Sequence, residues 1–155
     1  YRAMGRNDEA IHNLEIAVKY FPRYLPGYIS LAEVMYKAGN SDDAHRVLDQ
    51  VESVEPRFVK AKLTRARLRA HDGDIEGAIQ ALDEMFAKEP ENLEMLRLMG
   101  ELAIMGQKFF RAGEVFKRIL KVDPGDVRSI EALAMLYHQK SDHKRALELY
   151  TKAVE

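Results

Sequence analysis

The spacing of the prolines is the strongest constraint in this sequence. Four of the five prolines recur at intervals of 34 residues, at Pro22, Pro56, Pro90 and Pro124. Proline breaks or kinks a helix when it lies in the interior, and it also restricts the residue before it. A stop of this kind at a fixed interval indicates one structural unit that is repeated along the chain.

Small and large side chains follow the same interval. Two columns hold small residues, one holds mainly glycine, and one is large and apolar. In that order the columns are Ala10, Ala44, Ala78, Ala112 and Ala146; Ala32, Ala66, Gly100 and Ala134; Gly5, Gly39, Gly73, Gln107 and Ser141; Leu14, Leu48, Leu82, Phe116 and Tyr150. Small side chains let two helices approach closely, and the large column fills the space between them.

Between these columns the apolar residues recur every three to four positions, as at Ile11, Leu14 and Val18, which is the period of a helix. No stretch alternates for long enough to predict a strand. Each unit is therefore predicted to be two antiparallel helices, with a short turn near the glycine column and a break at the proline. The predicted units are a partial one at 1–24, full ones at 25–58, 59–92 and 93–126, and a nearly complete one at 127–155.

Composition and motifs narrow the function. The 155 residues include 24 basic and 25 acidic ones, a balance that argues against a dedicated nucleic-acid or membrane-surface binder. The chain has no cysteine, and its five histidines lie in different repeats or at spacings that do not suit a metal. It also lacks a phosphate-binding loop and a catalytic serine motif. We therefore predict no enzyme activity, metal site or cofactor, and the composition leaves the compartment open.

The interval, the small columns, the glycines, the large column and the terminal proline together resemble the tetratricopeptide repeat (TPR), over the whole chain. The resemblance implies an all-α fold, a right-handed superhelical solenoid of antiparallel helix pairs, as a single array over residues 1–155. It also implies a scaffold whose first helices line a concave, protein-binding groove. We expect the array to be an excerpt of a longer protein, because Tyr1 falls late in a first helix.

The family's inward-facing places predict the residues of that groove. They are Pro26, Ile29, Glu33, Tyr36 and Lys37; Lys60, Leu63, Arg67, Ala70 and His71; Glu94, Arg97, Glu101, Ile104 and Met105; Arg128, Glu131, Met135, His138 and Gln139. Charge alternates along equivalent places, as in Glu33, Arg67 and Glu101. Two interpretations stay open: the charges set the register of an amphipathic peptide held by apolar anchors, or they form only solvated ion pairs between repeats.

The unit at 59–92 departs from the family pattern. Lys62, Arg65 and Arg69 stand where the family usually has large apolar or aromatic side chains. Their aliphatic stems can cover a neighbouring helix, or their charges can recruit an acidic partner. RNA binding through these residues with Lys60 and Arg67 is a further hypothesis, and the near-zero net charge argues against it.

Other roles are also possible for a chain of this kind. It could be the targeting or regulatory arm of a larger multidomain enzyme or assembly, or it could self-associate through the apolar residues Leu147 and Tyr150 of its last helix. A heat-shock chaperone tail is disfavoured as ligand, because the places of the family's carboxylate clamp hold residues such as Ile29, Glu33 and Thr64. No membrane insertion is expected, since no apolar run approaches the length of a membrane span.

Overall fold

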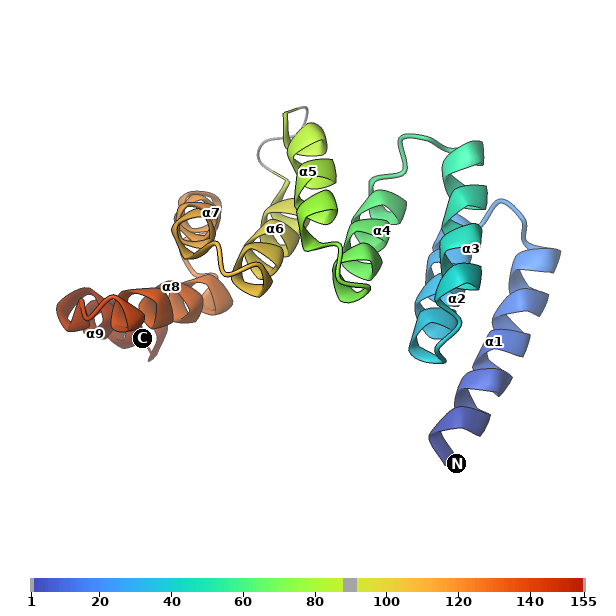
Figure 1. Ribbon diagram of the computed structural model, residues 1–155, viewed down its shortest axis with the longest axis horizontal. Helices are drawn as coiled ribbons and strands as arrows, with labels where there is room; N and C mark the ends of the chain where they lie inside the picture. The colour runs from blue at the N-terminus through green and yellow to red at the C-terminus, as the bar shows by residue number, and fades with distance from the viewer. Residues whose placement is uncertain (1, 88–91, 155) are drawn as a thin grey trace. The chain divides into compact units, whose positions relative to one another are not determined.

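The computed structural model describes residues 2–87 and 92–154, and all regular secondary structure in these two ranges is α-helical. The helices are α1 (Arg2–Tyr20), α2 (Leu25–Lys37), α3 (Ser41–Val54), α4 (Val59–His71), α5 (Ile75–Phe86), α6 (Leu93–Met105), α7 (Phe109–Val122), α8 (Val127–Gln139) and α9 (His143–Val154) (Figure 1). The predicted all-α helical-repeat fold is confirmed.

The first helices of the repeats begin in step with the prolines. Helices α2, α4, α6 and α8 start at residues 25, 59, 93 and 127, each three residues after a proline of the 34-residue series. The chain leaves the helical conformation around Pro22, Pro56 and Pro124, whereas Pro90 lies outside the described residues. The proline column therefore separates one helix pair from the next.

The turn inside each helix pair needs one residue in the left-handed region. Gly39 and Gly73 adopt it with φ of 91° and 99°, and Gln107 and Ser141 adopt it with φ of 55° and 60°. Gly5 is different, because α1 runs through it without the predicted turn. Only four residues precede Gly5 in this chain, so no helix is present there for the turn to join, and glycine also accepts helical φ and ψ.

The chain divides into two compact units, residues 1–68 and 69–155, each described here by itself. Unit 1 contains α1, α2, α3 and most of α4. In its core the small column packs with the large column: Ala32 and Leu48 are both fully buried in one apolar cluster. Other buried members of that cluster are Ile29, Leu31, Met35, Ala44, Val47, Val51, Ala61 and Leu68.

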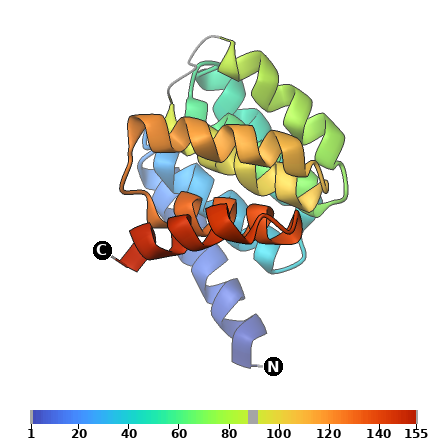
Figure 2. The same ribbon diagram turned by 90° about the vertical axis from the view of Figure 1, so that its left-hand side faces the viewer.

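Unit 2 contains the end of α4 and helices α5 to α9. Helix α6 packs against α5 and α7, and α8 packs against α7 and α9 (Figure 2). Here the large column holds Phe116, and the small column holds Gly100 beside it. A Cβ on Gly100 would lie 2.8 Å from Cε1 of Phe116, closer than carbon atoms can pack. The larger ring therefore requires the smaller residue.

Candidate functional site

In unit 1, the predicted groove residues divide between core and surface. Ile29 and Leu63 are each 2% exposed, so these two predicted anchors belong to the core and offer no surface to a ligand. Ile29 packs into the apolar cluster of unit 1, because the face of α2 that carries it points into the protein. Pro26, Glu33, Tyr36 and Arg67 are half-buried, and Lys37 and Lys60 are exposed.

The charged residues that depart from the family pattern on α4 bind carboxylates within the protein. In unit 1, the guanidinium of Arg65 lies 2.6 Å from Oδ1 of Asp49 and 2.8 Å from Oε1 of Glu52, both on α3. Partial burial opposes the charge of Arg65, but hydrogen bonds from Glu52 and Asp49 outweigh it and raise its pKa above the ordinary value. In unit 2, Arg69 lies 2.5 Å from Oδ2 of Asp74. Arg65 and Arg69 therefore do not form a free basic patch.

The alternating charges make no ion pairs with one another inside either unit. Across the described residues of unit 1, Glu33 and Arg67 do not pair, and across those of unit 2, Glu94 and Arg128 do not pair. These four side chains remain available to solvent, at least in part. The ion pairs that do form run from a first helix to a second helix or to a helix start.

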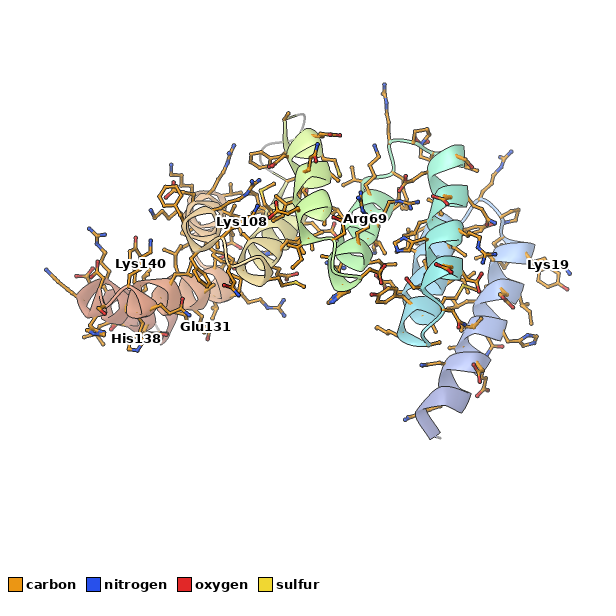
Figure 3. The ribbon with its side chains drawn as sticks, viewed as in Figure 1. Lys19, Arg69, Lys108, Glu131, His138 and Lys140 are labelled. Atoms are coloured by element: carbon orange, nitrogen blue, oxygen red, sulfur yellow. The ribbon has the colours of Figure 1, made fainter. Side chains whose placement is uncertain are left out.

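In unit 2, the predicted groove residues of α6 and α8 stay at the surface. Ile104 and Met105 at the end of α6 are 40% and 42% exposed, and Met135 in the middle of α8 is 57% exposed. On each helix the predicted residues are spaced by three and four positions, which places them on one face. We call this face the α6–α8 surface and define it by Glu101, Ile104, Met105, Arg128, Glu131, Met135 and His138. Figure 3 shows Glu131 and His138 on one side of α8.

Arg97, another predicted groove residue, holds α6 to the start of α8. Its guanidinium lies 2.5 Å from Oδ2 of Asp126 and 3.8 Å from Asp123. The other oxygen of Asp126, Oδ1, accepts a hydrogen bond from the backbone N–H of Ser129 at 2.8 Å and so caps α8. One carboxylate therefore fixes the position of α8 relative to α6, the two helices that carry the exposed apolar residues.

The ionisation of Asp126 follows from these contacts. Burial of its side chain, which is 8% exposed, opposes the charged form. The hydrogen bonds from Arg97 and Ser129 outweigh burial and lower the pKa of Asp126 below its ordinary value. Sequence reasoning missed this residue, although the signal was present: Asn92, one repeat earlier, caps α6 in the same way through a 3.0 Å hydrogen bond from Met95 N–H.

The remaining predicted features lie at the ends of helices. His71 is exposed at the end of α4, and Leu147 and Tyr150 on α9 are 67% and 40% exposed. Among the residues that the structure describes, no group of His, Asp or Glu is arranged to hold a metal ion. No helix within the same ranges combines the length and the apolar character that crossing a bilayer requires.

Comparison with known families decides the family of this chain. A tetratricopeptide repeat model matches residues 1–68 and 69–136, and another model of the same description matches residues 127–155. The chain belongs to the tetratricopeptide repeat family. No curated protein matches its sequence significantly.

Solved structures share the fold of this TPR chain at low sequence identity. PilF of Pseudomonas aeruginosa is 18% identical, with a TM-score of 0.78 over 99% of this chain and 70% of that one. A crystal structure of MamA is 19% identical, with a TM-score of 0.74 over 99% and 90%. A MamA fragment from Desulfovibrio magneticus RS-1 is also 19% identical, with a TM-score of 0.74 over 97% and 85%. Identity this low establishes a common fold only.

Proposed function

We propose that this TPR chain is a protein-interaction scaffold that binds a peptide or helix of a partner protein on the α6–α8 surface. Family membership supports the scaffold role in general. The particular surface is supported by one observation: Ile104, Met105 and Met135 are 40–57% exposed at places where the family presents side chains to ligands.

The chemistry of this surface suits an amphipathic segment. Methionine is flexible and polarisable, so Met105 and Met135 can adapt to the shape of an apolar side chain. The charges around them have both signs, with Glu101 and Glu131 on one hand and Arg128 on the other. Such rim charges set orientation and association rate more than affinity. The apolar face of a helix would therefore supply most of the binding energy.

Peptide selection on the immobilised chain tests this proposal. A random 16-residue display library would supply the ligand, and fluorescence polarisation would measure its dissociation constant. Burying one such side chain contributes about 1.5–3 kcal/mol. We therefore expect the double variant Met105→Ala, Met135→Ala to weaken the selected peptide at least about tenfold.

Leu147→Ala is the matched control for this experiment. It removes an equally exposed apolar side chain, 67% exposed on α9, and it should leave the affinity of the selected peptide unchanged. Equal affinities for the wild type and the double methionine variant would contradict the proposal. A role in a larger enzyme or assembly, and self-association through α9, stay predictions.

A further inference from the structure

Unit 2 has a second recessed surface, a cleft between α7, α8 and α9. Its volume is about 300 Å³, at the lower end of the range for ligand-binding cavities. The buried side chains of Leu133 and Leu136 line it, together with the aromatic rings of Phe109, Phe110 and Tyr137. A cleft of this size and lining accepts one large apolar side chain.

This cleft and the α6–α8 surface lie on opposite sides of α8. Successive residues of an α-helix are about 100° apart, so Leu136, Tyr137 and Lys140 face away from Met135 and His138. Figure 3 shows Lys140 on one side of the α8–α9 region and His138 on the other. The cleft is therefore a separate site, and an inference about it does not rest on the proposed function.

The cleft is open because position 113 carries no side chain. The equivalent places of the other repeats hold His45, Ile79 and Leu147. Glycine within a helix is destabilising relative to alanine, so its presence in α7 needs a reason. Packing does not supply one, because a Cβ on Gly113 would meet only Cδ1 of Leu136, at an ordinary 3.9 Å.

An exposed aromatic ring stands beside this gap. Phe110 lines the cleft and is 75% exposed. The equivalent places hold Asp42, Glu76 and Lys144, so the other repeats with this position have a charged residue there. A phenylalanine that remains three-quarters in water contributes little to the core, but it offers apolar surface that a ligand can cover.

The charges around the cleft leave one cation without a partner. Glu114 lies 2.8 Å from Nζ of Lys117, and Asp142 lies 3.5 Å from Nε of Arg145. The hydrogen bond from Lys117 also holds the pKa of Glu114 below its ordinary value, which keeps that pair ionised. Lys140 makes no ion pair with any residue in the described ranges. The cleft therefore carries one uncompensated positive charge.

We propose that this cleft binds a short acidic peptide segment of a partner protein. One large apolar side chain of the peptide enters the space left by Gly113, where Leu136 and the ring of Phe110 cover it. A carboxylate next to that side chain lies near Lys140. The apolar contact supplies the affinity, and the charge selects acidic over basic sequences.

Three fluorescein-labelled synthetic peptides test the proposal on the 155-residue chain. Their sequences are Gly-Asp-Asp-Phe-Asp-Asp-Gly, the same peptide with Ser in place of Phe, and the same peptide with Lys in place of every Asp. Fluorescence polarisation at low salt should show the first peptide binding at least tenfold more tightly than either of the others. Equal binding of the acidic and basic Phe peptides, or of the Phe and Ser peptides, would overturn the proposal.

Two variants locate the binding. Gly113→Leu fills the cleft and should weaken the acidic Phe peptide at least tenfold. Lys140→Glu changes only an exposed side chain, so it leaves the fold intact, and it should shift the preference from the acidic to the basic Phe peptide. If neither variant changes the affinities, the peptide does not bind in the cleft and the proposal is wrong.

Met135→Ala is the control from the opposite face of α8, and it should leave the affinity of the acidic Phe peptide unchanged. Circular dichroism on Gly113→Leu separates loss of binding from loss of folding. The α6–α8 surface is tested with a different ligand and different variants, so either site can fail while the other is retained.

Discussion

The repeat at 25–58 in unit 1 and the repeat at 93–126 in unit 2 follow one 34-residue plan with different side chains. The first pairs Ala32 with Leu48, and the second pairs Gly100 with Phe116. In each case the small residue and the large one are both buried. The comparison shows that the plan requires a combined volume at these two columns rather than a particular residue at either.

The largest expected effect tests this rule directly. Gly100→Ala places a Cβ 2.8 Å from the ring of Phe116, so the ring must leave its position. We expect a loss of about 1–3 kcal/mol in the free energy of unfolding, the usual cost of overpacking a core. Urea denaturation followed by circular dichroism measures it.

The double variant Gly100→Ala, Phe116→Leu is the control, because it rebuilds the Ala–Leu pair of the repeat at 25–58. It should recover most of the lost stability relative to Phe116→Leu alone, and the coupling is read from a double-mutant cycle. Additive effects of the two substitutions would show that Gly100 and Phe116 are independent, and the volume rule would then fail.

The two repeats also differ in how their first helices begin. Tyr24 precedes α2 and makes no side-chain cap, whereas Asn92 and Asp126 accept hydrogen bonds from the backbone of α6 and α8. Asp126 in addition binds Arg97. Unit 2 therefore stabilises the starts of its first helices by polar contacts that are missing at the start of α2.

An intermediate effect is expected at Asp126. Asp126→Ala removes the cap of α8, which typically costs about 0.5–2 kcal/mol, and it also leaves Arg97 without its closest carboxylate. Tyr24→Ala is the comparison in unit 1, where no side-chain cap is lost. Equal losses in urea denaturation would show that the cap at Asp126 contributes nothing.

The pH dependence of Asp126→Asn separates the charge from the cap, since asparagine still accepts the hydrogen bond. The pKa of Asp126 is lowered in the folded protein, so its charge stabilises the fold fully above about pH 4, the ordinary value for the unfolded chain. This contribution is lost as the pH falls through the lower, folded-state pKa. The stability difference from the wild type should be largest at pH 7 and smaller at pH 3. A difference independent of pH would contradict the ion pair.

The helix starts and turns could be predicted from the sequence because proline and glycine act on the backbone locally. Burial could not be predicted in the same way. Ile29 and Ile104 both occupy inward-facing places of the family, yet one is 2% exposed and the other 40%. What covers a side chain depends on its neighbours in three dimensions, and the register of a repeat does not specify them.

The same reason explains what sequence reasoning missed at the candidate sites. Gly100 and Gly113 are both glycines within helices, and nothing local distinguishes them. Only the distance from a hypothetical Cβ to Phe116 or to Leu136, 2.8 Å against 3.9 Å, shows that the first is required by packing and the second is not. The double role of Asp126 likewise depends on Arg97, which lies 29 residues earlier in the sequence.

The smallest expected effect concerns the turn inside each helix pair. Gly39 takes the left-handed conformation in the repeat at 25–58, and Gln107 takes it in the repeat at 93–126, with φ of 91° and 55°. A residue with a Cβ pays about 1–2 kcal/mol for this conformation, and glycine loses about 0.5–1 kcal/mol through its greater freedom when unfolded. Gln107→Gly should therefore raise the free energy of unfolding by about 0.5–1 kcal/mol, and Gly39→Gln should lower it by a similar amount. If Gln107→Gly instead destabilises the protein in urea, the glutamine side chain contributes a contact that outweighs the backbone cost, and the two turns are not equivalent.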